Sequence, residues 1–250
     1  MLNHTLDQLT ELRLQGMKNA LIEQVEKPSL FVDMSFEERF SFLIEKEITE
    51  RRNRRIQYML RNARLKYRDA LLIDIDYHRS RGLDKKLIQA LSRNDWLDQF
   101  HNLIITGPTG TGKTWLANAL ANQAVISGYS AHYIRISTLM AELALKRAEG
   151  NYLKWLKKMK SFRLLILDDL GLMALTMEQT QELLEVIEAR NGNGSMIVTS
   201  QLPINEWYSY FKNPTLADAI MDRLIHNAYK INLKGESMRK IKNAVSVSNI

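Results

Sequence analysis

One stretch of eight residues, GPTGTGKT at 107–114, has the G-x-x-x-x-G-K-[ST] spacing of a phosphate-binding loop. It follows a short apolar run, LIIT, and precedes a helical run, TWLANALANQAV, which is the context this motif requires. Glycines let the backbone turn its N–H groups toward phosphate oxygens, and the helix that follows adds the positive end of its dipole. Lys113 can reach the β- and γ-phosphates, and Thr114 offers a hydroxyl to Mg²⁺. The residues expected to bind ATP are therefore Gly107, Pro108, Thr109, Gly110, Thr111, Gly112, Lys113 and Thr114.

A second run, LLILDDLG at 164–171, is typical of a buried parallel strand that ends in two carboxylates. Ligands bind at the carboxyl ends of such strands, so Asp168 is expected to hold Mg²⁺, directly or through water. Asp169 could orient or deprotonate the attacking water. Many such ATPases have a glutamate at this position, and the aspartate is one methylene shorter. Either the backbone compensates for the shorter side chain or turnover is slow.

A complete strand-like run, AHYIRI, lies between these two motifs along the chain, so another strand is expected between the two motif-bearing strands. The next run, SMIVTSQ at 195–201, ends in polar residues. Thr199, Ser200 or Gln201 would project between the glycine-rich and acidic strand ends and position water beside the γ-phosphate. The alternative is a polar strand end without a role.

Two arginines near the C-terminus are candidates for contacts to the phosphates. Arg223 lies in a helical apolar pattern and could reach a neighbouring subunit's nucleotide, where it would stabilise transition-state charge. It could instead pair with Asp218 or Asp222 on a solvated helix. Arg239 could sense phosphate within its own subunit, or be one more basic residue of a basic tail.

Strand-like runs alternate with helical ones from residue 101 onward, which predicts an α/β fold with a parallel five-stranded sheet between helices. The first hundred residues read as helix, and Ser35 with Glu38 forms a capping-box signature that opens the second helix. We divide the chain into a helical region for DNA binding or self-association (1–70), a linker with a helical lead-in (71–98) and an ATPase core (99–250).

The composition favours a polyanionic partner, because the net charge is +7 and the pI is near 9.5. The absence of cysteine excludes disulfides and thiolate metal sites, and the histidines show no ligand spacing. The N-terminus lacks the features of a signal peptide, and no run of 18 apolar residues exists. The expected location is the cytoplasm, without membrane contact.

Basic residues gather in two tracts. TERRNRRIQYMLRNARLKYR at 49–68 has eight arginines and lysines from Arg51 onward, with no acid among them. A helix would place Ile56 and Met59 on one face and most of the arginines opposite, out to Arg68. Nucleic-acid phosphate is one partner for that face, and an acidic protein surface, including another subunit, is the other. The candidates for DNA binding in this tract are Arg51, Arg54, Arg55, Arg61 and Arg64.

The second tract, residues 146–163, adds Lys154, Lys157 and Lys158 as candidates for DNA binding. Trp155 could stack on DNA or belong to the core. Contacts from lysines go mostly to phosphate, so binding should be weakly sequence-specific and steeply salt-dependent.

Five motifs, GPTGTGKT, LLILDDLG, IVTSQLP, LADAIMDRLIH and GESMR, together resemble the IstB/DnaC-like AAA+ P-loop ATPases, and the chain is most similar to the IstB branch. The resemblance implies ATP-dependent oligomers that assemble on duplex DNA, deform it, and recruit and stimulate a partner transposase, IstA, with hydrolysis driving release. It assigns Lys113 and Thr114 to the phosphate loop, Asp168 and Asp169 to the acidic strand, and Arg223 and Arg239 to the intersubunit and phosphate-sensing positions.

The sequence departs from the family at Gln201, where many relatives have Asn, which leaves open whether Thr199, Ser200 or Gln201 senses the γ-phosphate. Only eleven residues follow Arg239, so we expect no C-terminal lid domain. Two other functions stay open: a replicative helicase loader of DnaC type, and a binding module in which ATP is only a structural ligand.

Overall fold

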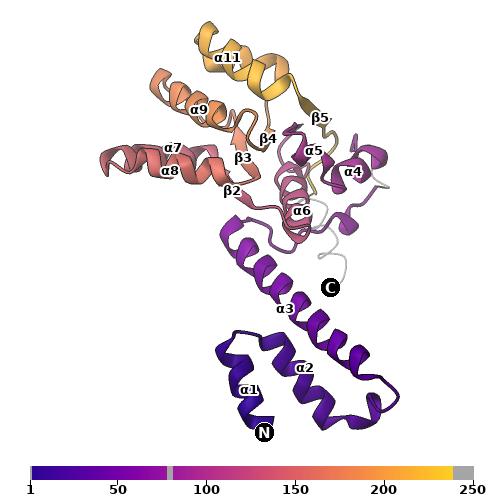
Figure 1. Cartoon of the computed structure of the whole chain (residues 1–250). Helices are drawn as coiled ribbons and strands as arrows, with labels where there is room; N and C mark the ends of the chain where they lie inside the picture. The colour runs from indigo at the N-terminus through magenta and orange to yellow at the C-terminus, as the bar shows by residue number, and fades with distance from the viewer. Residues whose placement is uncertain (1, 78–80, 239–250) are drawn as a thin grey trace, which may run out of the picture. The chain divides into compact units, whose positions relative to one another are not determined.

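The computed structural model describes residues 2–77 and 81–238. The chain divides into two compact units, an N-terminal unit (Met1–Tyr58) and a C-terminal unit (Met59–Ile250). The division lies inside a long helix, upstream of the 71–98 segment at which we divide the sequence. Figure 1 shows the elements of both units.

The N-terminal unit is helical. It contains α1 (Leu2–Glu11), α2 (Gln15–Glu26), a short 3₁₀ turn η1 (Pro28–Leu30) and most of α3 (Phe36–Ala63). The predicted capping box is confirmed: the Ser35 N–H donates to the Glu38 carboxylate at 2.7 Å, and the Glu38 N–H donates to Ser35 Oγ at 3.3 Å. It opens the third helix and not the predicted second, because the chain turns between α1 and α2, where Arg13 has a left-handed φ of +59°.

Helices α2 and α3 pack closely at Gly16. A Cβ atom there would lie 2.6 Å from the Glu47 Cα, so only glycine fits. The buried Glu47 carboxylate accepts the N–H groups of Gly16 and Met17 at 2.7 and 3.2 Å, at the first turn of α2. A carboxylate at a helix N-terminus satisfies backbone donors and is favoured by the helix dipole, so Glu47 fixes the packing of α2 on α3.

The C-terminal unit contains an alternating series of strands and helices after its short leading elements. These are η2 (Leu72–Asp74), α4 (Lys85–Ser92), α5 (Asp95–Asp98), β1 (Asn102–Thr106), α6 (Lys113–Ile126), β2 (Ala131–Arg135), α7 (Ile136–Ala148), α8 (Tyr152–Ser161), β3 (Leu164–Leu170), α9 (Met177–Arg190), β4 (Ser195–Ser200), η3 (Ile204–Glu206), α10 (Trp207–Phe211), α11 (Pro214–Ile225) and β5 (Ala228–Asn232).

The five strands form one parallel sheet in the order β2-β3-β4-β1-β5, as predicted. The two motif-bearing strands, β1 and β3, are separated by one strand in the sheet, as expected, and that strand is β4. The AHYIRI run forms β2, which lies at the edge of the sheet beside β3. Helix α6, with α4 and α5, covers one face, and α7, α8, α9 and α11 cover the other (Figure 1). Parallel strands covered on both faces are buried along their length, and β1, β3 and β4 are almost entirely so. The sheet therefore brings its carboxyl-terminal ends together on a rigid base.

The predicted basic helix ends earlier than the sequence pattern suggests. Helix α3 stops at Ala63, and Arg64 adopts a left-handed φ of +53° that ends it. The following segment is held by α6 instead. Asn118 Oδ1 accepts the N–H groups of Lys66 and Tyr67 at 2.8 and 3.3 Å. The Asn122 amide donates to the Arg68 and Ala70 carbonyls at 3.0 and 3.1 Å. Arg68 therefore does not continue a helical basic face.

Candidate nucleotide site

The phosphate loop joins β1 to α6 and is enclosed by the segment that follows β5. Gly112 is the N-cap of α6 and has a φ of +99°, in the region that favours glycine. Cβ atoms at Gly107 and Gly110 would collide with the Leu233 carbonyl and the Ser237 side chain. These glycines are therefore required by close backbone approach as well as by their positive φ angles.

The Lys113 ammonium group lies within the loop. Its Nζ donates to the carbonyls of Gly107 at 2.7 Å and Pro108 at 2.9 Å. Burial lowers the pKa of Lys113, and the negative charges of Asp169 and Asp168 oppose that shift. The two carboxylates thus help to keep a buried lysine in its charged form, which is the form that binds phosphate.

Asp168 is fully buried and accepts three hydroxyl groups. Its Oδ1 accepts Thr114 Oγ1 at 2.9 Å and Thr199 Oγ1 at 2.6 Å, and its Oδ2 accepts the Tyr133 hydroxyl at 2.6 Å. Burial and the bond to Asp168 raise the pKa of Tyr133, so Tyr133 remains a donor. Four elements, β2, β3, β4 and α6, therefore meet at one carboxylate.

Asp169 lies where β3 becomes irregular against β4, and it has a left-handed φ of +64°. Aspartate tolerates this conformation better than most residues. Its Oδ2 accepts Arg135 Nη2 at 2.6 Å and Nε at 3.1 Å, and this hydrogen bonding raises the pKa of Arg135. The Asp169 N–H donates to Thr199 Oγ1 at 3.0 Å. The backbone turn separates the two carboxylates, so that Asp168 faces inward and Asp169 faces Arg135.

Tyr133 and Arg135 belong to no sequence motif that points to the site. Both lie in β2, and the strand register places Arg135 beside Asp168. The alternation in AHYIRI puts these two side chains on the same face, but the neighbour that they contact depends on the order of strands in the sheet.

The three polar residues at the end of β4 separate in the structure. Thr199 joins the cluster around Asp168. The Ser200 hydroxyl instead donates to the Leu170 carbonyl at 2.7 Å, so its side chain does not reach the carboxylates. Gln201 accepts from Thr109 Oγ1 at 2.8 Å and thus contacts the phosphate loop.

Arg223 is held within its own subunit. Its Nη2 lies 2.8 Å from a carboxylate oxygen of Glu188 on α9, and its Nη1 donates to the Ala219 carbonyl. Among the residues that the structure describes, Arg223 forms no ion pair with Asp218 or Asp222, so the pairing within α11 that the sequence suggests is replaced by one between α11 and α9. Arg239 lies outside the described residues.

Three of the five arginines expected to bind DNA have acidic partners. Arg51 and Arg54 lie 2.6 and 3.7 Å from Glu47, and Arg64 lies 3.3 Å from Glu142. No acidic residue lies among the basic residues from Arg51 onward, but Glu47 precedes Arg51 by one helical turn and pairs with Arg51 and Arg54. Within residues 2–77 and 81–238, Arg55 and Arg61 are exposed and have no ion pair.

The second basic tract forms α8. Lys154, Lys157 and Lys158 are exposed and lie at i, i+3 and i+4, on one side of that helix, without ion pairs among the described residues. Trp155 is buried and donates to Glu142 at 3.1 Å, so it belongs to the core and stacking on DNA is excluded.

The residues fit a magnesium nucleotide. Thr114 and Asp168 provide adjacent oxygen ligands of the kind that Mg²⁺ prefers. Among the described residues, no cluster of three or more His, Cys, Asp or Glu could hold a metal by itself. That pattern suits an ion whose remaining ligands are water and substrate phosphates.

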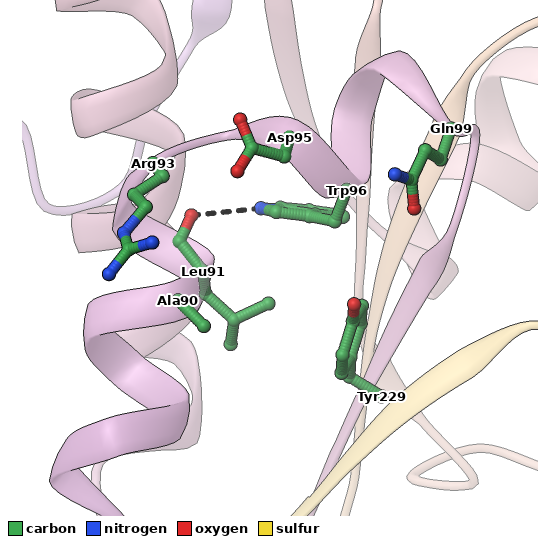
Figure 2. Close-up of a pocket in the computed structure, with 7 residues that line it drawn as sticks. All are labelled: Ala90, Leu91, Arg93, Asp95, Trp96, Gln99 and Tyr229. Atoms are coloured by element: carbon green, nitrogen blue, oxygen red, sulfur yellow. Dashed lines mark hydrogen bonds between the residues drawn. The ribbon is translucent and has the colours of Figure 1, made fainter.

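A separate cavity of about 210 Å³ lies at the other end of the sheet (Figure 2). Its lining includes Trp96, whose indole donates to the Leu91 carbonyl at 3.0 Å, and Tyr229, which pairs with Leu103 near the start of β1. The phosphate loop follows the opposite end of β1. The cavity is therefore not part of the nucleotide site.

Comparison with known proteins identifies the family. Residues 7–246 match the model of the family described as IstB-like ATP binding protein. The chain belongs to this IstB-like family. Its relatives include a protein of Sinorhizobium fredii named as an insertion sequence ATP-binding protein, which is 43% identical over 96% of this chain and 98% of its own length. A protein of the insertion sequence IS1162 in Pseudomonas fluorescens is 45% identical over 81% of this chain and 87% of its own length.

Solved structures show the fold of this IstB-like protein. The crystal structure of DnaI has a TM-score of 0.55 at 22% identity and covers 71% of this chain and 94% of its own. The DnaC helicase loader has a TM-score of 0.54 at 21% identity over 68% and 99% of the two chains. The predicted AAA+ type of P-loop fold is confirmed, and both the family model and the relatives are described as ATP-binding proteins. Within the described part of the chain, no helix is both long and apolar enough to cross a membrane.

The contact between Arg135 and Asp169 yields a test. Arg135→Ala removes the guanidinium group that occupies Asp169 Oδ2, so this oxygen can accept a water molecule instead. We expect the rate of ATP hydrolysis to rise about threefold or more, with nucleotide affinity within about twofold of the native value. Arg135→Lys keeps the charge and should stay near the native rate. Steady-state hydrolysis and equilibrium titration measure both quantities. A fall in rate at unchanged affinity would show that Arg135 assists hydrolysis instead of restraining Asp169.

Proposed function

We propose that this protein is a Mg²⁺-dependent ATPase that assembles as a homo-oligomer on duplex DNA, deforms the DNA, and recruits and stimulates the partner transposase IstA. Hydrolysis drives release. The convergence of Lys113, Thr114, Asp168 and Thr199 at the carboxyl ends of neighbouring strands, in a chain of the IstB-like family, is the observation that carries the proposal.

Each group has a distinct role in the proposed reaction. The loop N–H groups and Lys113 bind the phosphates, and Thr114 and Asp168 hold Mg²⁺, which neutralises phosphate charge when bound. Asp169 orients the attacking water once it leaves Arg135. Arg223 of one subunit stabilises transition-state charge at the nucleotide of the next. Arg239 is proposed to sense phosphate in its own subunit.

Self-association has support in the N-terminal unit. Phe36, Phe40, Ile44 and Ile48 recur every four residues on α3 and are 69%, 47%, 39% and 61% exposed. Glu47 follows Ile44 by three residues on α3, so the exposed stripe borders the face that packs on α2. Acidic residues flank its first half, and Arg51, Arg52, Arg54 and Arg55 follow its end. A second copy of α3, running antiparallel, would cover the stripe and place acidic against basic residues.

DNA binding has support in exposed cations that form no ion pair within the described part of the chain, namely Arg55, Arg61, Lys154, Lys157 and Lys158. A helicase loader of DnaC type is the alternative. The loaders match the fold alone, whereas the insertion-sequence relatives match nearly the whole chain, so we favour transposition. Pull-down against a transposase and a replicative helicase distinguishes the two functions.

The ATP cycle is tested by retention of duplex DNA. We expect retention with ATP or a non-hydrolysable analogue, and weak retention without nucleotide. Asp169→Asn should bind ATP and keep DNA at least about tenfold longer, because hydrolysis and hence release are blocked. A dissociation assay by fluorescence anisotropy measures the lifetimes. If Asp169→Asn binds ATP, fails to hydrolyse it and releases DNA at the native rate, then hydrolysis does not drive release, and ATP is only a structural ligand.

The lysines of α8 are tested through salt dependence. A variant with Lys154, Lys157 and Lys158 all changed to Ala should lower the slope of log affinity against log salt by about 2 to 3, since each phosphate contact contributes about 0.9. The control changes Lys86, Lys212 and Lys230 to Ala, three exposed lysines outside α8. An unchanged slope in the α8 variant, or an equal fall in the control, would exclude a specific role for α8.

A further inference from the structure

An arginine outside all the motifs lies against the phosphate loop. Arg81 precedes α4, and its side chain is buried, with 9% exposure. A Cβ atom built on Gly112 would lie 3.5 Å from Arg81 Nη1, the nearest atom among the described residues outside the glycine's own stretch of chain. Gly112 is the N-cap of α6, where backbone N–H groups face a bound phosphate. The guanidinium group is thus at the rim of the loop.

The backbone that carries Arg81 is fixed in place. The Arg81 carbonyl accepts the Lys234 N–H at 2.9 Å. The next residue, Gly82, has a φ of +72°, and a Cβ there would lie 2.7 Å from the Asn232 carbonyl. The same segment after β5 contacts Gly107 and Gly110. The segment 233–238, here called the strap, therefore contacts both Arg81 and the phosphate loop.

The hydrogen-bonding capacity of Arg81 is only partly used. Nη2 donates to the Asp76 carbonyl at 2.9 Å, but the buried Nε has no partner among the described residues. No carboxylate in the described part of the chain forms an ion pair with this guanidinium group. A structural role for Arg81 explains only its hydrogen bond to the Asp76 carbonyl. Burial of an incompletely paired cation is costly, so a further anionic partner is expected at this position.

We propose that Arg81 binds a phosphate oxygen of a nucleoside polyphosphate in the loop. The proposal rests on the nucleotide site described above and adds a contact from outside the loop and strand motifs. Charge-assisted hydrogen bonds from arginine to phosphate are stronger than neutral ones, so Arg81 contributes to affinity for the phosphate chain and not to recognition of the base.

The test compares ATP with inorganic tripolyphosphate, which has no nucleoside. Isothermal titration in Mg²⁺ buffer should show that Arg81→Ala weakens both ligands by about tenfold or more. Arg81→Lys should recover part of the loss, since it retains the charge. Arg93→Ala removes an exposed arginine at the C-terminal end of α4 and should leave both affinities unchanged. Thermal unfolding without ligand checks the fold, and Arg81→Gln replaces the alanine variant if that variant unfolds.

Two outcomes overturn the proposal. Equal affinities of native and Arg81→Ala protein for both ligands would make Arg81 structural. Loss of ATP affinity with unchanged tripolyphosphate affinity would move the contact to the nucleoside. Failure of the nucleotide site itself is recognised separately, because native protein and Lys113→Ala would then bind ATP equally.

Discussion

The buried carboxylate of Asp168 is the interaction on which the nucleotide site depends. A buried charge is tolerated only when it is fully hydrogen-bonded, and the hydroxyls of Thr114, Tyr133 and Thr199 meet that requirement. These bonds fix the start of α6 against three strands. Farther along α6, Asn118 and Asn122 hold residues 66–70 through their backbone groups. A continuous set of hydrogen bonds therefore links the expected Mg²⁺ ligands to the segment that follows the basic helix.

Charged groups that the proposed chemistry needs already have partners in the single subunit. Asp169 accepts Arg135, Arg223 pairs with Glu188, and Lys113 donates to the loop carbonyls. The pair between Arg223 and Glu188 is partly exposed, with side-chain exposures of 28% and 46%. Such pairs contribute only about 0–1 kcal/mol, so a neighbouring subunit's nucleotide can displace Glu188 at little cost. In the proposed oligomer, the contact between Arg223 and the neighbouring nucleotide therefore forms without the loss of a strong ion pair.

Local patterns were enough to predict the phosphate loop, the five strands and the capping box at Ser35, because each follows from a few consecutive residues. Contacts that depend on strand order or on chain reversals were not predictable in the same way. Tyr133 and Arg135 reach the carboxylates only because β2 is adjacent to β3. Arg81 reaches the loop only through the strap after β5. Helix α3 ends at a left-handed Arg64, which no helical periodicity indicates.

ATP hydrolysis by a mixture of Lys113→Ala and Arg223→Ala subunits tests most directly whether a nucleotide is shared between subunits. Each variant alone should be inactive. In an equal mixture, random assembly places an intact loop beside an intact Arg223 at about one interface in four, so about a quarter of the native rate should return. Two correctly folded variants that bind each other and remain inactive at every mixing ratio would contradict the shared site.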